Sequence, residues 1–292
     1  MAVKKSTTKA KTNTTKAAKT AKKTVVAKVV KPTKSNVTIT TSRRFSLTQI
    51  NLLSVVTFFV LVVLAVVLMS PATYELTATY LTADKLAGGA IVPAYRHFID
   101  VEYRWLLVAI LGLSAVGPLM HITRMKITYA NAVKSKVMPW NWVEQGVLQA
   151  LLGVLVVTLL GFQDITTVKL FAVGLFVVSL LSWYAEKEFL VNKVAAMRTH
   201  LFAAIAGLML VLFMAMPLVY TYIYGQVRAP WYVYAVTAAF VLTLGLNRFN
   251  QFNYLRSRKS WKNYEIVERN HLVIGLVSKL SIAVILIVGL AK

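Results

Sequence analysis

The sequence predicts an all-α membrane protein with seven transmembrane helices and a short β-hairpin in the first outer loop. The first observation is composition: 58% of the 292 residues are apolar and 15% are charged, against about 45–50% and about 25% in soluble domains. The second is a set of seven apolar runs of about 20 residues, long enough to cross a hydrocarbon core. The third is the one-sided distribution of basic residues around these runs. Together they argue against a soluble enzyme, and we expect no catalytic residues.

The cysteine and histidine content argues against thiol chemistry and against a metal site. The sequence has no cysteine, which excludes disulfides, thiolate zinc sites and cysteine nucleophiles. Its four histidines are scattered along the chain and form no cluster with the spacing of metal ligands, so we expect no metal: His97, His121, His200 and His271.

Residues 1–44 predict a disordered, basic, cytosolic tail. They hold 13 of the 33 Lys and Arg residues and no acid, in a low-complexity background of Thr, Ala, Ser and Val. Such a segment has too little apolar surface to offset its ordering entropy. Binding to anionic lipid or to an acidic partner is an alternative role. A nucleic-acid arm or a transit peptide is a further alternative, but the tail has no aromatic residue to stack on bases, and we expect no nucleic-acid partner.

Residues 45–292 are expected to form the bundle of seven helices. A lipid-exposed backbone must satisfy its own hydrogen bonds, and a helix does so within one segment. The spans are placed at 46–69, 104–124, 137–160, 166–186, 200–222, 230–252 and 266–290. Pro118, Pro139 and Pro217 are then kinks or first-turn residues rather than breaks.

The basic residues predict which way the chain crosses the membrane. Counted over alternate connections, 26 of the 33 Lys and Arg residues fall on the side of the amino terminus and six on the other side, with Lys279 inside a span. Cytosolic loops carry the excess of positive charge. The sequence therefore predicts an integral, multi-pass protein with its amino terminus in the cytosol and its carboxyl terminus outside.

The long outer connection, near 70–103, predicts the β-hairpin. Its TYELTATYLT stretch alternates β-branched or aromatic residues with small or polar ones, and LAGGAIVPAY follows a Gly-Gly turn. We expect this hairpin to lie over the outer face of the bundle. The connections at 187–199 and 253–265 carry basic residues and are expected to face the cytosol.

The most informative charged residue is Lys279, in the middle of the last apolar run. It stands eleven positions after Glu268, about 16 Å along a helix. An uncompensated lysine at that depth costs at least about 2.5–3.5 kcal/mol, so it needs a partner or a covalent modification. A structural ion pair and a functional lysine are both open. Glu144 is the natural partner, because it lies about 10 Å into the third span, which runs in the same direction.

Other polar residues near the inner side have two interpretations each. Glu186 is either an interfacial acid paired with Lys187 or Arg198, or a hydrogen-bonded group in a polar cavity. Glu268 is expected at the interface, solvated or paired. His121 is expected at headgroup level, with proton handling as the alternative.

Several stretches of the chain resemble the heliorhodopsin family of retinal-binding proteins over most of 42–290. A lysine in the seventh helix and a carboxylate on the third are typical of rhodopsins, and an inside amino terminus is typical of heliorhodopsins. The seventh-helix match is the most specific, with Trp261, Tyr264, Glu268 and Lys279 at the family's spacing. The similar stretches are RRFSLTQINLL, LTATYLTADKLAGGAIVPAYR, PWNWVEQG, SWYAEKE, APWYVYA and WKNYEIVERNHLVIGLVSKL.

The resemblance implies a rhodopsin-like bundle that holds all-trans retinal on Lys279 as a protonated Schiff base, with Glu144 as counterion. A carboxylate within about 4–6 Å favours the charged form of such a nitrogen. Other residues expected around the retinal are Gly275, Ser278, Gln145, Trp183 and Trp231. Those expected in an inner proton network are Glu186, Glu268 and His121.

Three positions depart from the family pattern. Gly275 stands one turn before Lys279, where the family usually has a serine. Gln145 and Gly146 replace the usual Tyr-Ser pair after the counterion, and the family's first-helix histidine falls near Leu53 or Ser54. In the family, these positions are thought to form the polar network on the inner side of the bundle and to hold protons within it.

Three functions follow as hypotheses. The first is a photosensor that lies in the lipid bilayer, forms a homodimer and signals to an unknown partner. The second is a light-gated passive proton transporter or channel. A pump is disfavoured because the outer halves of the spans contain no acid. The third is a pigmentless scaffold, which leaves Lys279 unexplained.

Overall fold

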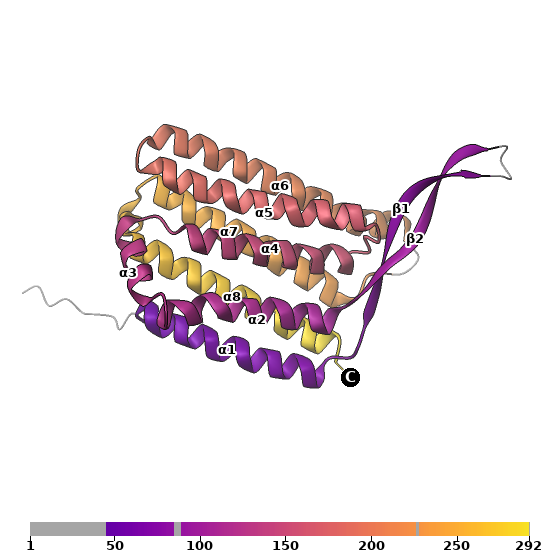
Figure 1. Ribbon diagram of the computed structural model, residues 1–292, viewed down its shortest axis with the longest axis horizontal. Coiled ribbons are helices and arrows are strands. Elements are labelled where there is room, and N and C mark those ends of the chain that lie inside the picture. Colours follow the sequence, from indigo (N-terminus) through magenta and orange to yellow (C-terminus); the bar gives the residue numbers. More distant parts are fainter. Residues whose placement is uncertain (1–44, 85–88, 226–227, 292) are drawn as a thin grey trace, which may run out of the picture. The chain divides into compact units, whose positions relative to one another are not determined.

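The computed structural model describes residues 45–84, 89–225 and 228–291 (Figure 1). The chain divides into two units, 1–44 and 45–292, and every element below belongs to the second unit. The predicted tail lies outside the described residues, so its disorder stays a prediction.

Seven helices in these ranges are long and apolar enough to cross a membrane, which confirms the predicted fold class. The long helices are α1 (Leu47–Leu68), α2 (Tyr103–Ile122), α4 (Pro139–Leu159), α5 (Ile165–Phe189), α6 (Lys193–Tyr224), α7 (Trp231–Leu255) and α8 (Tyr264–Gly289). The remaining elements are the strands β1 (Thr73–Asp84) and β2 (Ala90–Glu102), helix α3 (Lys126–Ser135) and the 3-10 turn η1 (Lys259–Lys262).

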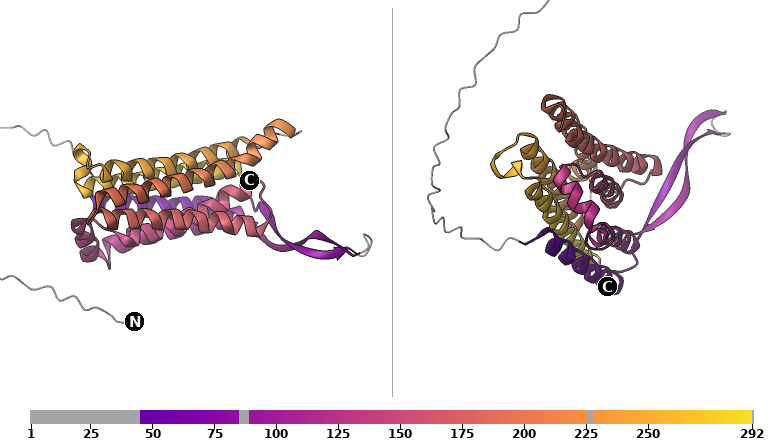
Figure 2. Two further views of the ribbon diagram at one scale, coloured as in Figure 1. Left: turned by 90° about the horizontal axis from the view of Figure 1, so that it is seen from above. Right: turned by 60° about the vertical axis from the view of Figure 1, so that its left-hand side comes forward.

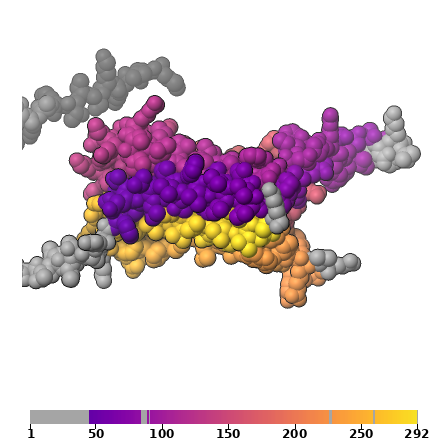
Figure 3. Space-filling view, turned by 90° about the horizontal axis from the view of Figure 1, so that it is seen from below, coloured from indigo at the N-terminus to yellow at the C-terminus, as the bar shows by residue number. Residues whose placement is uncertain are grey.

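The seven long helices pack side by side as one bundle (Figures 1 and 2). Helices consecutive in the chain are neighbours, and α1 closes the ring against α8 (Figure 3). Helix α4 also contacts α7, and 61% of its apolar window is buried, against 11% for α6. The predicted third span is therefore the central helix, and α6 leaves most of its surface to the lipid.

Local capping explains where the helices begin. Ser46 starts α1 with a capping box: its Oγ accepts from the Gln49 amide at 3.2 Å, and its own amide donates to Gln49 Oε1 at 2.8 Å. Asn192 caps α6 by accepting from the amides of Val194 and Ala195 at 3.0 and 3.2 Å. Helix α6 therefore begins at Lys193, so most of 187–199 is helical rather than a connection, and its predicted cytosolic side stays a prediction.

Helix α3 was not predicted. Its sequence, KITYANAVKS, is polar enough to read as a connection between spans. It forms a helix in contact with the ends of α2 and α8. The ring of its Tyr129 stacks on the ring of His121, with centroids 4.1 Å apart. Helix α3 therefore covers one end of the bundle.

The two strands form an antiparallel hairpin whose base is tied to the bundle. The Thr77 amide donates to the Gln163 carbonyl at 2.8 Å, and Thr79 Oγ1 donates to Asp164 Oδ1 at 3.1 Å. Farther out, Leu81 is 73% exposed and the strands project away from the helices (Figure 1). The hairpin thus occupies the predicted 70–103 segment. In the described part of the chain its hydrogen bonds to the bundle lie at its base, so it does not lie over the outer face along its whole length.

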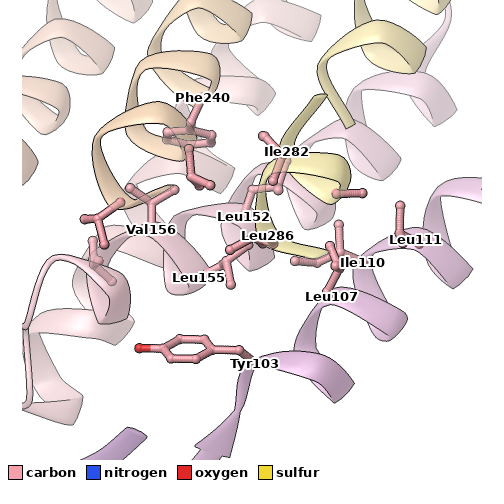
Figure 4. Packing of buried hydrophobic residues seen from close by; sticks show 14 of the residues in the cluster. Tyr103, Leu107, Ile110, Leu111, Leu152, Leu155, Val156, Phe240, Ile282 and Leu286 are labelled. Atoms are coloured by element: carbon pink, nitrogen blue, oxygen red, sulfur yellow. The ribbon is translucent and has the colours of Figure 1, made fainter. Parts of the chain in front are cut away.

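Buried side chains divide the bundle into two halves. The hairpin-side half, where α1 ends and α2 begins, holds the large apolar core, with Leu107, Leu155, Phe240 and Leu286 among its members (Figure 4). The α3-side half, where α1 begins and α2 ends, holds most of the buried polar side chains. They include Asn51, Ser54, His121, Asn141, Gln145, Glu186, Asn247, Asn250, Gln251 and Glu268. A smaller cluster around Tyr254 and Tyr264 closes the α3 end.

Candidate functional site

Lys279 lies near the boundary of the two halves, in the middle of α8. The residue is only 9% exposed, and its Nζ lies 5.4 Å from the centroid of the Phe58 ring on α1. Among the residues that the structure describes, no carboxylate oxygen lies within 4.0 Å of this amine. A buried structural ion pair would need such a contact. Lys279 is therefore a buried amine without a direct acid partner.

A cavity of about 40 Å³ lies beside Lys279, between α1, α2, α4 and α8. A water molecule needs about 10–15 Å³ of such space and two or more polar partners, so the cavity can hold water. Glu144 and Gln145 on α4 and Gly275 on α8 line it together with Lys279, which brings four of the seven predicted retinal contacts together. The other lining residues are Ser54, Phe58, Ser114, Pro118, His121, Asn141, His271, Leu272 and Leu276.

A second, smaller polar cavity lies closer to α3 and contains Glu186 and Glu268. The Glu186 carboxylate accepts from Trp142 Nε1 at 2.8 Å and from the Tyr264 hydroxyl at 3.1 Å. Each of these donors comes from a different helix. Glu186 therefore joins α4, α5 and α8, and of its two predicted roles the structure favours the hydrogen-bonded group in a cavity.

Glu268 has a similar environment. Its Oε1 accepts from Asn141 Nδ2 at 2.8 Å and from the Tyr129 hydroxyl at 3.1 Å. Burial, and the nearby charge of Glu268, raise the pKa of Tyr129 well above its usual range, so this hydroxyl keeps its proton and donates. Glu268 is 3% exposed, so of the two expected states the solvated one is wrong. The physical reason is that α3, absent from the prediction, covers this end of α8.

The two cavities share part of their walls. Asn141 and His271 line both of them. The ring of His271 lies 5.5 Å from the ring of Trp142, which binds Glu186. Polar side chains therefore extend from the neighbourhood of Lys279 to the two buried carboxyl groups near α3.

His121 is also buried in the bundle. It is 5% exposed, lines the first cavity and has its Nδ1 atom buried without a hydrogen-bond partner. The ring is therefore buried beneath Tyr129 of α3, and its level relative to the lipid headgroups stays a prediction. Arg248, counted among the inner-side basic residues, lies partly buried in the bundle and donates to Ser182 Oγ and, at 3.1 Å, to the Val178 carbonyl.

Three predicted retinal contacts do not line this cavity. Ser278 lies next to Lys279 but turns to a lipid-facing groove between α7 and α8, where its Oγ donates to the Gly275 carbonyl at 3.2 Å. Trp183, on α5, has a buried Nε1 without a partner and lines neither cavity. Trp231 is 57% exposed at the first residue of α7 and lines neither cavity.

Sequence reasoning missed several cavity residues, although local signals for them exist. Asn141 precedes Glu144 by three positions, which places both on one face of α4. Asn247, Asn250 and Gln251 have the same helical spacing on α7, and three amides in one span are a polar stripe. His271 follows Glu268 by three positions. Polar residues at such intervals inside an apolar span were the available evidence.

A bundle of seven spans with a buried lysine in the last one is the architecture of a rhodopsin transmembrane domain. Among solved structures, the chain is similar to the transmembrane domain of the Salpingoeca rosetta rhodopsin phosphodiesterase. The TM-score is 0.59, with 11% sequence identity over 83% of this chain and 83% of that chain. At this identity the likeness shows the fold alone. The comparison with curated proteins gives no match.

The heliorhodopsin family model matches residues 43–290. Because this match covers most of the chain, the chain belongs to the heliorhodopsin family, as its motifs predict. Family and fold support a retinal-binding, light-sensing rhodopsin that is an integral, multi-pass membrane protein. The family also supports a non-enzymatic photoreceptor or transporter rather than an enzyme.

Proposed function

We propose that this protein is a photoreceptor in which all-trans retinal is bound to Lys279 as a protonated Schiff base, with Glu144 as its counterion. The observation that carries the proposal is the buried Lys279 amine, which has no ion-pair partner within 4.0 Å among the described residues. An unpaired amine at that depth is costly. A covalent link to a ligand accounts for its presence.

The surrounding residues fit such a ligand. Gly275, one turn before Lys279, has open space where a Cβ atom would be, so the surface beside the amine is unobstructed. When bound, retinal supplies the absorption of visible light and a light-driven change of shape. Glu144 supplies the negative charge that favours a cation on the Lys279 nitrogen. Gln145 and Ser114 supply polar groups that can hold water in the cavity.

The test is to express the protein with retinal and record its absorption spectrum. We expect a visible band that Lys279→Ala abolishes and that hydroxylamine bleaches under light. Ser278→Ala is the matched control, because Ser278 is the preceding residue but faces the groove between α7 and α8. A band that survives Lys279→Ala would contradict the proposal.

The counterion is tested by Glu144→Gln, which removes the charge and keeps the shape of the side chain. We expect the alkaline bleaching of the pigment to move to lower pH, and the visible band to shift. The band moves to the blue where the proton is lost and to the red where it is kept. If the alkaline bleaching of Glu144→Gln matched that of the wild type, another acid would be the counterion, and Glu186 would be tested next.

A second candidate function is passive, light-gated proton conduction. It is favoured by the two polar cavities, which share Asn141 and His271 and contain three acidic residues. The acids outside the α3-side half lie in the hairpin or in the loop before α5, so uphill pumping is not expected. Voltage clamp under light separates the two functions: a current that reverses with the proton gradient supports conduction, and a flat trace at every potential supports the photosensor.

We also propose the predicted topology, with the amino terminus in the cytosol, and a homodimer in the bilayer that signals to a partner. The 26 basic residues against six support this orientation. The sequence Asn36-Val37-Thr38 fits a glycosylation site. Expression in eukaryotic cells tests the topology, because glycosylation of Asn36 would show that the amino terminus lies outside the cytosol.

A further inference from the structure

Gly117 on α2 marks an unusually close approach between two helices. It is buried, and a Cβ atom placed there would overlap the Cδ and both Oε atoms of Glu144 on α4. The carboxyl group of Glu144 therefore fills the space that a methyl group at position 117 would take. The other helix-α2 glycine, Gly112, has open space at the same place. Only Gly117 makes room for a functional side chain in this helix.

The slot at Gly117 lies between two different environments. On one side is the polar cavity that Glu144 shares with Lys279. On the other is an apolar groove of about 200 Å³ between α2 and α4, lined by Gly117 and Glu144 together with Leu113, Val116, Met120, Trp140, Val143, Val147 and Leu148. In the slot, the carboxyl group is not within 4.0 Å of the Lys279 amine.

We propose that Gly117 is a positioning residue that holds the Glu144 carboxylate away from the Lys279 nitrogen by leaving a slot for it in α2. The groove lining is apolar apart from Glu144 itself and the Trp140 indole, whereas the cavity offers an ionised carboxylate the Gln145 amide and the Lys279 amine. A methyl group at position 117 closes the slot. The carboxylate then moves into the cavity, toward Lys279. This inference rests on the proposed function of Lys279 and Glu144.

The change in distance has a measurable consequence. Bringing an opposite unit charge from about 6 Å to about 4 Å, at an effective dielectric constant of about 20, favours the protonated nitrogen about tenfold. A closer anion also stabilises the ground-state positive charge of the pigment. Gly117→Ala should therefore shift the absorption band to the blue and move alkaline bleaching about one pH unit upward.

The matched control is Gly112→Ala, on the same helix, which adds the same methyl group in open space. We expect its band and its alkaline bleaching to match the wild type. The inference is overturned if Gly117→Ala gives the same spectrum and titration as Gly112→Ala, or if its band moves to the red. The proposed function stands in either case, because the pigment still forms on Lys279.

A second measurement needs no retinal. In the retinal-free protein, alanine in place of glycine favours a helix, so Gly112→Ala should raise the midpoint of thermal unfolding. Gly117→Ala should raise it by less, because its methyl group must displace the Glu144 carboxyl group from the slot. Combining Gly117→Ala with Glu144→Asp, which shortens the acid by one methylene, should remove that penalty.

This cycle keeps the two proposals separate. If the wild type forms no pigment, the proposed function fails, while the unfolding midpoints still test the slot. If Gly117→Ala alone does not fold, the combination with Glu144→Asp is expected to fold. If the double variant did not fold while Glu144→Asp alone folded normally, the proposed slot for the Glu144 carboxyl group would be contradicted.

Discussion

The hairpin-side and α3-side halves of the bundle differ in what holds their helices together. In the hairpin-side half, contacts between helices are made by apolar side chains such as Leu107, Leu155 and Phe240. The buried hydroxyl of Thr237 there donates to a carbonyl of its own helix, that of Val233, at 2.8 Å. Polar groups in this half therefore add little to the contacts between helices.

In the α3-side half, polar groups connect different helices. Glu268 of α8 binds α3 and α4 through Tyr129 and Asn141, and Asn250 of α7 donates to the Val267 carbonyl of α8 at 2.9 Å. Some polar atoms stay unsatisfied, including both amide atoms of Asn247. The hairpin-side half is held by apolar packing, whereas polar groups with free hydrogen-bonding capacity gather in the α3-side half. Apolar packing therefore joins the helices of the hairpin-side half, and polar contacts join those of the α3-side half.

The largest expected effect is on the packing of the hairpin-side half. Phe240 on α7 is fully buried, so Phe240→Ala should lower the free energy of unfolding by about 3–5 kcal/mol through the cavity it leaves. Phe249→Ala, on the same helix but 57% exposed, should change it by less than about 0.5 kcal/mol. Thermal unfolding in detergent measures both. Equal effects would show that this half is not a packed core.

A smaller effect is expected from Glu268 in the α3-side half. Glu268→Ala leaves the Asn141 and Tyr129 donors without an acceptor, which should cost about 1–3 kcal/mol of unfolding free energy. Glu268→Gln keeps a carbonyl acceptor and should recover most of the loss. Glu265→Ala is the control, because Glu265 is exposed one turn earlier on α8. If the three variants were equally stable, the polar contacts would not join these helices.

The smallest effect concerns the base of the hairpin, where the link to the bundle is polar and exposed. Burial raises the pKa of Asp164, but hydrogen bonds from Thr167 and Thr79 outweigh that effect, so the pKa lies below its usual range. A depressed folded-state pKa gives stability above the unfolded-state pKa that is lost as the pH falls through the folded-state pKa. The base should therefore loosen below about pH 4.

Hydrogen exchange at the Thr77 amide, which binds the Gln163 carbonyl at the hairpin base, measures that loosening. Protection should fall in acid for the wild type. Asp164→Asn keeps a cap for α5 but has no charge to lose, so its protection should not depend on pH in this range. An acid-induced loss of equal size in both proteins would assign the effect to another group.

Much of the architecture could be predicted from local sequence. The seven spans, the hairpin and the family follow from runs, alternation and motifs along the chain. The start of α6 was misplaced, because hydropathy responds to the apolar core of a helix and not to the Asn192 cap that begins it. Helix α3 was missed because its ten residues are polar, and its Tyr129 is buried only by contacts with other segments.

The number of spans and the places of Lys279 in the last span and Glu144 in the third could be predicted from the sequence, because they depend on position along one helix. The contacts of Tyr129 and Asn141 with Glu268, and the place of the Glu144 carboxyl group against Gly117, are visible only in the folded protein. Such contacts depend on how each helix is rotated about its axis. Polar residues at helical spacing mark the inward face of a span, but they do not show which residues of other helices that face contacts.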